Sequence, residues 1–333
     1  MLFRSWDFTA IGLAIPSGHQ ATEGPLDSTS ISQPENQLMH VFLTGATGFI
    51  GSAIIPELIN AGHTVLGQTR SDAGAKALAA TGIESHFGTL EDPDSLRAGA
   101  AKADAVIHCA YDHDFSKYAE NGVKDVRAIE ALGAALAGSN RPLIVSAGIT
   151  PFTPGRAATE DDDAPEQAMI GRNSEQAAMA LRAKGVSPAV MRLPQVHDTT
   201  KFGLISMMIA TAREKGVSGY VGDGTGCMPA AHISDVARLY RLALDKHVAG
   251  GRYHAVGEEG VLIKNIAEAI GRGLKIPVVS IAEENAFAHF GFFGPFAGRH
   301  APASSSLTQQ RLSWQPTGPG MIADLDNMRW FEG

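Results

Sequence analysis

The sequence predicts an α/β fold built on a doubly wound parallel sheet, with a smaller substrate-binding region after it. A glycine-rich turn, TGATGFIG at 44–51, joins an apolar run to a helix-like stretch. Beyond this turn, strand-like runs and helix-like stretches alternate as far as Leu193. Alternation with short turns is typical of parallel sheets covered by helices on both faces, as in Rossmann-type folds.

The glycine-rich turn is a candidate phosphate-binding loop. Gly45 would allow the tight turn, Gly48 would let the backbone approach a pyrophosphate, and Gly51 would let the helix pack close to the strand. The N-terminus of the following helix offers free N–H groups and the positive end of a dipole. An ordinary strand-to-helix turn is the alternative. We expect cofactor contacts from six residues of the turn: Gly45, Thr47, Gly48, Phe49, Ile50 and Gly51.

The elements of the first half follow from apolar patterning. Strands are expected at His40–Thr44, Thr64–Thr69, Ala105–Cys109, Leu143–Ser146 and Ala189–Leu193. Helices are expected between them at Phe49–Asn60, Ala73–Ala80, Val123–Ala137 and Glu175–Lys184. Gly62 lies where the first helix should end, and Pro56 would kink that helix.

The pattern is less regular after Asp198. Helices are expected at Phe202–Lys215, at Ser234–Lys246 with Ser234 as the cap, and at Ile263–Leu274, with a turn-rich loop at Val221–Gly226. We therefore expect a dinucleotide-binding domain at 39–198 and a substrate-binding region at 199–333, packed intimately on it.

The first 38 residues differ from the rest, being rich in Ser, Pro, Gly and Gln without a sustained period. The apolar run Phe8–Pro16 is short, and its surroundings match neither a signal peptide nor a mitochondrial presequence. We expect a poorly ordered extension, with Met39 as a plausible alternative start. A docked arm is the alternative, because Phe3, Trp6 and Phe8 could cover an apolar patch.

Composition narrows the class of protein. The chain has 333 residues, 44% hydrophobic and 19% charged, which is ordinary for a soluble globular protein. A net charge of −8 argues against nucleic-acid or anionic-membrane partners. Two cysteines predict no disulfide framework. We expect a cytoplasmic protein with a small-molecule substrate, and we leave open whether it forms a homodimer. No metal motif is apparent, and Asp161–Asp163 is expected to be a solvated loop.

The end of the second strand indicates the cofactor. An acidic residue there binds the ribose of NAD, whereas an arginine suits the 2′-phosphate of NADP. Arg70 and Ser71 occupy this position, so we expect NADP. Asp72 keeps NAD possible.

Further motifs occur in a specific order: DAVIHCA at 104–110, RLPQVH at 192–197, PAAHISDVARLY at 229–240 and LSWQP at 312–316. With the three-and-three glycine spacing, they make the chain, from about Met39 onward, resemble the extended and atypical short-chain dehydrogenase/reductase superfamily, including the NAD(P)-dependent epimerase/dehydratases. The resemblance implies further cofactor contacts from Leu90, Ala110, Pro194 and Val196. Gly88-Thr89-Leu90 stands where the family usually has an aspartate beside the adenine.

The family's catalytic pair, a tyrosine with a lysine four residues later, is absent. No tyrosine of the chain has that lysine, and Ile170 and Ser174 stand where the pair is expected. Arg172 is a basic residue in the same segment, as in atypical members, where it could hold the ribose or polarise a carbonyl. A solvated helix face is the alternative for Arg172.

Other candidates follow the fourth and fifth strands. Tyr111 and His113 come just after the fourth strand, where ligands bind in open sheets, and His113 has a pKa suited to proton transfer. Asp112 and Asp114 are near enough in sequence to orient it. The resemblance implies that Ser146, or Gly148 if the register shifts, contacts the substrate carbonyl.

Two more histidines complete the expectations: His197 should face the cleft, and His232 should be structural. The reading favoured is an NADP-dependent oxidoreductase of atypical type acting on a small or mid-sized carbonyl or alcohol. An epimerase or dehydratase that retains NAD is the second reading. A non-catalytic, nucleotide-sensing regulator is the third, because the tyrosine and lysine are missing.

Overall fold

A seven-stranded parallel sheet forms the centre of the structure, with the strand order β10-β6-β5-β4-β1-β2-β3. The computed structural model describes residues 38–149, 155–164 and 172–330. In chain order the strands are β1 His40–Thr44, β2 Thr64–Thr69, β3 Glu84–Phe87, β4 Ala105–His108, β5 Pro142–Gly148, β6 Ser187–Leu193 and β10 Arg252–His254. The predicted α/β class with a Rossmann-like parallel sheet is confirmed.

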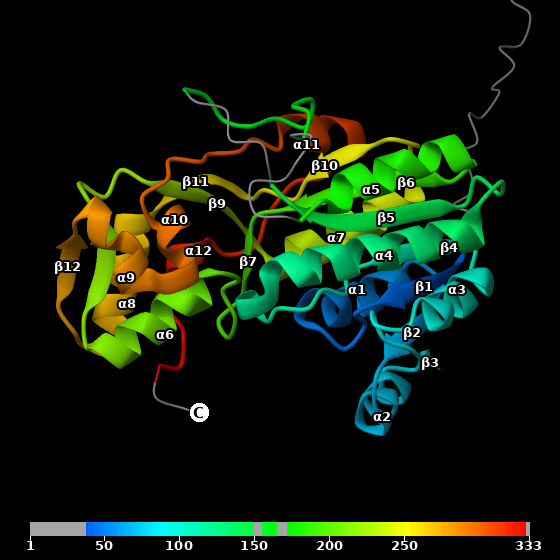
Figure 1. The fold of residues 1–333 in the computed structure, drawn as a ribbon, viewed down its shortest axis with the longest axis horizontal. Coiled ribbons are helices and arrows are strands. Elements are labelled where there is room, and N and C mark those ends of the chain that lie inside the picture. The colour runs from blue at the N-terminus through cyan, green and yellow to red at the C-terminus, as the bar shows by residue number, and fades with distance from the viewer. Residues whose placement is uncertain (1–37, 150–154, 165–171, 331–333) are drawn as a thin grey trace, which may run out of the picture. The chain divides into compact units, whose positions relative to one another are not determined.

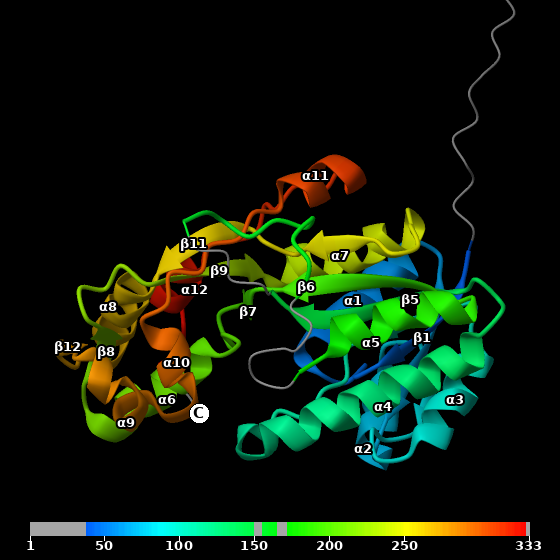
Figure 2. The same ribbon diagram turned by 45° about the horizontal axis from the view of Figure 1, so that its top comes forward.

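Helices cover both faces of this sheet (Figures 1 and 2). One face packs against α1 (Phe49–Asn60), α2 (Asp72–Ala80) and α7 (Ile233–Asp245). The other packs against α3 (Pro93–Ala101), α4 (Tyr118–Leu136) and α5 (Ser174–Ala180). Alternation along β1 divides the two cores, because Val41 and Leu43 join the first and Phe42 joins the second.

The C-terminal part builds two smaller sheets and a third core (Figure 1). One sheet joins β7 (Gln195–His197), β9 (Cys227–His232) and β11 (Glu258–Leu262), and the other joins β8 (Ser218–Val221) and β12 (Val278–Ile281). The helices around them are α6 Ile205–Lys215, α8 Ile263–Leu274, α9 Ala286–Phe290, α10 Gly294–Ala297, α11 Ser306–Leu312 and α12 Met321–Asp326. The short 3-10 helices are η1 Phe115–Lys117, η2 Leu181–Lys184, η3 Glu283–Asn285 and η4 Gly291–Phe293.

The large sheet uses segments from both sides of residue 198. Strand β10 pairs with β6, and α7 packs on the same face as α1. After building part of the smaller region, the chain thus returns to the large sheet. The expected division into two regions at residue 198 stays a prediction.

Several expected boundaries differ from those of the structure. β3 and α3 were not expected, and α4 begins at Tyr118, five residues earlier than the apolar pattern indicates. The expected helix Glu175–Lys184 is α5 followed by η2. The predicted cap of α7 is wrong, because the His232 imidazole, not Ser234, accepts a hydrogen bond from the Ser234 N–H (3.3 Å). Across the described ranges, no helix combines the length and apolar character needed to cross a bilayer.

Candidate functional site

A cavity of about 1030 Å³ lies at the carboxyl ends of the parallel strands. Its lining includes residues that directly follow four of the strands, namely Gly45 after β1, Arg70 after β2, Cys109 after β4 and Pro194 after β6. The smaller region contributes Met207, Phe292 and Arg299, among others. Open α/β sheets bind ligands at this edge, so the cavity is the candidate site.

The glycine turn lines the cavity, and its close packing requires glycine at two positions. Gly45 has a φ of +68°, and a Cβ there would lie 2.8 Å from the Ala110 nitrogen. A Cβ on Gly51 would lie 2.1 Å from the Gly45 carbonyl oxygen. Gly48 closes the turn by donating its N–H to Gly45 O (2.9 Å). The close packing of α1 against the strand therefore requires residues without a Cβ at Gly45 and Gly51.

The N-terminus of α1 has the features that a pyrophosphate requires. Its N-cap residue is Gly48, which provides no capping side chain, and its first turn carries no acidic residue. Phe49, Ile50 and Gly51 of that turn line the cavity, as do Thr47 and Gly48. Because the first turn of a helix leaves N–H groups without intrahelical acceptors, these residues fit a dinucleotide.

Arg70 is exposed and lines the cavity directly after β2. Ser71 caps α2, where its hydroxyl accepts from the Gly74 N–H (3.1 Å). Asp72 begins that helix and lies outside the cavity lining. Leu90, Ala110, Pro194 and Val196, which the family resemblance implied as cofactor contacts, all line the cavity.

The expected tyrosine and lysine positions are only partly described. Ile170 lies outside the described residues. Ser174 begins α5, and its buried hydroxyl donates to the buried Asp125 carboxylate. At this position the chain therefore has a hydroxyl committed to a buried carboxylate instead of a free ammonium group.

Asp125 is the centre of a buried polar network. Its other oxygen lies 3.3 Å from His108 Nε2, and His108 Nδ1 lies 2.7 Å from the hydroxyl of Thr44. Burial acts to raise the pKa of Asp125, but the hydrogen bond from His108 and the charge of Arg172 outweigh it, so this pKa is lowered. The lowered pKa favours the charged form of Asp125, next to Arg172.

Arg172 is fixed on several sides. Its Nε donates to Ser174 Oγ (2.9 Å), and its Nη2 donates to the Ser146 carbonyl (3.1 Å). Its Nε lies 3.9 Å from Asp125 Oδ2, and the guanidinium lies 3.9 Å above the centre of the Tyr111 ring. This arrangement places a held cation beside the ring of a candidate proton donor.

Tyr111 and His113 both line the cavity and meet edge to face, with 5.4 Å between ring centres. The Tyr111 hydroxyl is buried without a hydrogen-bond partner among the described residues, and this burial is the main cause of its raised pKa. His113 is exposed to solvent. Its pKa is nevertheless lowered from the usual 6.5, first because the ring is partly desolvated and second because Arg172 is positively charged. Near neutral pH, Tyr111 is therefore a hydrogen-bond donor and His113 is largely neutral.

The carboxylates beside His113 in the sequence have other partners. Asp112 binds Lys124 (2.8 Å), which also binds Glu91 (2.7 Å), another residue of the cavity lining. Asp114 caps η1 by accepting from the Ser116 N–H (3.1 Å). Neither carboxylate orients the imidazole through a hydrogen bond.

Ser146 is buried below the cavity. Its hydroxyl donates to the His108 carbonyl (2.7 Å) and lies 2.7 Å from the Tyr240 hydroxyl. Gly148, which was the alternative in that register, lines the cavity. The geometry thus places the backbone at Gly148, and not the Ser146 side chain, at the surface that a ligand would meet.

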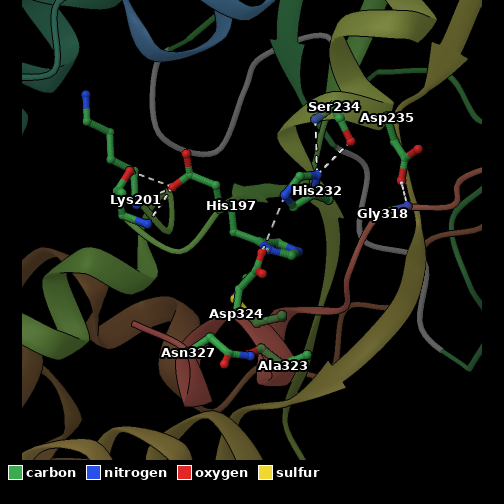
Figure 3. Close-up of polar contacts among 12 residues, drawn as sticks. His197, Lys201, His232, Ser234, Asp235, Gly318, Ala323, Asp324 and Asn327 are labelled. Carbon is green, nitrogen blue, oxygen red and sulfur yellow. Dashed lines mark hydrogen bonds and ion pairs between the residues drawn. The ribbon is translucent and has the colours of Figure 1, made fainter. Parts of the chain in front are cut away.

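A second polar cluster lies apart from this lining, around His197 (Figure 3). His197 is fully buried, and its Nδ1 lies 2.7 Å from Asp324 Oδ2 of α12. His232 Nε2 is 3.8 Å from the same oxygen. The expectation that His197 faces the cleft is wrong, because its ring stacks on Phe202 and binds Asp324 instead.

Sequence reasoning missed Asp125, although a signal for it exists. Asp125 lies on the buried face of α4, on the stripe formed by Ala128, Ile129 and Leu132. A carboxylate at a core position of an amphipathic helix indicates a buried partner. The partners themselves, His108 and Ser174, are distant in the sequence.

Comparisons with known proteins agree with this geometry. The model of the NAD dependent epimerase/dehydratase family matches residues 41–138. An uncharacterized protein of Schizosaccharomyces pombe is 44% identical to this chain, and the match covers 88% of this chain and 100% of that protein. An uncharacterized protein of Saccharomyces cerevisiae is 40% identical, and the match covers 86% of this chain and 98% of that protein. Among solved structures, a dTDP-glucose 4,6-dehydratase of Streptomyces venezuelae with NAD bound is similar in fold. The TM-score is 0.68 at 17% identity, covering 88% of this chain and 97% of that one.

Proposed function

The chain belongs to the NAD-dependent epimerase/dehydratase family of the extended short-chain dehydrogenase/reductase superfamily, and from this we propose that it is an NADP-dependent oxidoreductase of atypical type. Its substrate would be a small or mid-sized carbonyl or alcohol. One observation carries the proposal: the phosphate-fitting turn, Arg70, Tyr111, His113 and Arg172 all line the same cavity.

The chain's residues divide the binding of the cofactor between them. The first turn of α1 would hold the pyrophosphate, Arg70 would meet a 2′-phosphate, and Pro194 and Val196 would flank the nicotinamide. When bound, the nicotinamide supplies or accepts a hydride. The solved dehydratase holds NAD. Arg70 is the feature that favours NADP in this chain.

The proton would be handled by the segment after β4. The Tyr111 hydroxyl, protonated at neutral pH, would donate a hydrogen bond to the substrate oxygen. His113 would exchange a proton with that oxygen, and its exposed side would let it exchange protons with water. Arg172 would position Tyr111 through the ring contact and bring positive charge to the oxygen as negative charge develops there.

The test is turnover with released cofactor. We expect the purified full-length protein to oxidise NADPH in the presence of a carbonyl panel, with one alcohol formed for each NADPH consumed. A nucleotide that stays bound while a sugar is converted would instead support an epimerase or dehydratase.

A nucleotide-sensing regulator is the second candidate, favoured by the Ser174–Asp125 hydrogen bond at the position of the missing lysine. A buried, committed hydroxyl supplies no catalytic charge. Under this candidate the protein binds NADP(H) with no turnover on any carbonyl, and binding changes its affinity for a protein partner. Calorimetry followed by turnover assays on the same preparation separates the two functions.

A further inference from the structure

Six aromatic side chains form one continuous wall of the cavity, which we call the aromatic wall: Tyr111, His113, Phe115, Tyr118, Phe292 and Phe296. The first four come from the segment after β4, and the last two come from η4 and α10 of the smaller region. The wall begins at the candidate proton carriers, so it lies beside the position of the reacting carbonyl.

Two contacts between aromatic rings join the two parts of the wall. The rings of Phe115 and Phe292 have centres 4.8 Å apart at 28°, and Tyr118 lies 5.2 Å from the same Phe292 ring. Phe292 continues to Phe296, 5.9 Å away. Each of these four rings also reaches the cavity surface. Phe292 is thus the ring that connects the catalytic segment to the smaller region.

The other side chains that the smaller region presents to the cavity are mainly apolar. They include Leu204, Met207, Ala210, Met228, Pro229 and Pro302, and the polar exceptions are Lys201, Ser206 and Arg299. A sugar ring needs hydrogen-bond partners around its hydroxyls, whereas rings and aliphatic chains favour flat, apolar surfaces through burial and offset stacking. Among the polar groups of the lining, Tyr111, His113 and Arg172 are in contact with one another and suit a single carbonyl oxygen.

We propose that the cavity selects a planar, largely apolar carbonyl compound, such as an aromatic ketone or aldehyde, which stacks on the aromatic wall with its oxygen toward Tyr111 and Arg172. This proposal rests on the function proposed above, because it assumes that the reacting end of the substrate lies beside Tyr111. In the reduction, a C–H bond forms at the carbonyl carbon with hydride from NADPH, and the oxygen takes its proton from His113. NADP⁺ and a secondary or primary alcohol are the products.

The test measures binding and turnover separately, with 2-acetonaphthone as the planar probe and UDP-glucose as the sugar probe. Calorimetry on the full-length protein loaded with NADP⁺ should show binding of 2-acetonaphthone and none of UDP-glucose. Phe292→Ala should weaken binding of the ketone about tenfold, since the ring contributes both area and stacking. Phe287→Ala is the matched control, because Phe287 lies in the neighbouring helix α9, is 70% exposed and is not part of the cavity lining.

The outcomes separate the two proposals. If 2-acetonaphthone binds in a way that depends on Phe292 but NADPH is not oxidised, the proposed role of the aromatic wall is supported and the oxidoreductase function is contradicted. NADPH oxidation with other carbonyl compounds, without binding of the ketone, supports the oxidoreductase function and overturns the proposal of the aromatic wall. Equal affinity in Phe292→Ala and Phe287→Ala also overturns it. If Phe292→Ala loses NADP⁺ binding, Phe292→Leu is measured in its place. Leucine keeps most of the apolar volume and removes the aromatic ring. Unchanged affinity for the ketone in Phe292→Leu would show that the ketone does not stack on this ring.

Discussion

Arg172 is held by three partners in the structure, which separates it from an arginine on a solvated helix face. Its side chain is 20% exposed and reaches Ser174, the Ser146 carbonyl and the ring of Tyr111. Because two hydrogen bonds hold different nitrogens of the guanidinium and the ring lies against its face, its charge keeps a constant position relative to Tyr111. A lysine, with a flexible stem and a point charge, would not occupy this site in the same way.

His113→Ala should lower kcat by about 10²-fold or more, the usual scale of general acid–base catalysis, and leave NADPH affinity nearly unchanged. Tyr111→Phe should have a smaller effect, because it removes a hydrogen bond and not a titrating group. Steady-state kinetics with the best carbonyl from the panel measure both. Wild-type rates in both variants would move the proton transfer to another group.

The pH dependence follows from the lowered pKa of His113. In alcohol oxidation the imidazole must be neutral to accept a proton, so the rate should fall as the pH drops through a midpoint below 6.5. In carbonyl reduction the protonated form is the donor, so the same midpoint should appear as a rate that rises toward low pH. His113→Ala should remove this limb in both directions; a limb that persists in the variant belongs to a different residue.

Arg70→Ala should weaken NADPH binding and leave NADH binding nearly unchanged. The guanidinium is exposed at the cavity and suits the additional phosphate that only NADPH carries. Calorimetry with both nucleotides on wild type and variant measures the selectivity. Tighter binding of NADH than of NADPH by the intact protein would show that the arginine does not face the ribose.

At the scale of elements, the β1–turn–α1 unit depends on close approach of the backbone. The Cβ of Gly51→Ala would lie 2.1 Å from a carbonyl oxygen, and backbone cannot move aside as a flexible side chain can. We expect the variant to lose about 1–3 kcal/mol of stability through overpacking and to bind NADPH at least about tenfold more weakly. Ser52→Ala, one residue later with an exposed side chain, is the control and should retain both. Thermal melts and calorimetry give the comparison, and unchanged affinity in Gly51→Ala would contradict the close packing.

Elements with strong local signals were predictable from the sequence, and edge elements were not. The bounds of β1, α1 and β2 agree with the structure because apolar alternation and the glycine turn mark them. Strand β3 was missed because its sequence, ESHF, is polar and partly exposed at the edge of the sheet. Helix α3 was missed because its apolar content is low, although Asp92 caps it.

The cavity residues that could be predicted are likewise those with a local sequence signal. The residues that motifs mark, such as Gly45 and Pro194, line it as expected. Asp125 and Phe292 were not predicted, because their importance comes from contacts between segments that are far apart in the sequence. Local sequence patterns do not indicate contacts of this kind, because the residues come together only in the folded protein.

At the scale of the whole chain, residues 1–37 lie outside the described residues, and the predicted extension remains a prediction. A protein that starts at Met39 should melt within a few degrees of the full chain and keep its NADPH affinity, because the first strand begins at His40. A large loss of either in differential scanning fluorimetry or calorimetry would show that the aromatic arm contributes to the folded protein.

The position of β10 in the sheet has a consequence for synthesis on the ribosome. Translation adds roughly 5–20 residues per second, so several seconds separate the emergence of β6 from that of its partner β10. During that interval the nascent polypeptide presents β6 as an unpaired edge, the kind of surface that chaperones bind and that otherwise promotes aggregation. A fragment that stops at Asp198 would keep this edge permanently, and we expect it to be recovered in inclusion bodies.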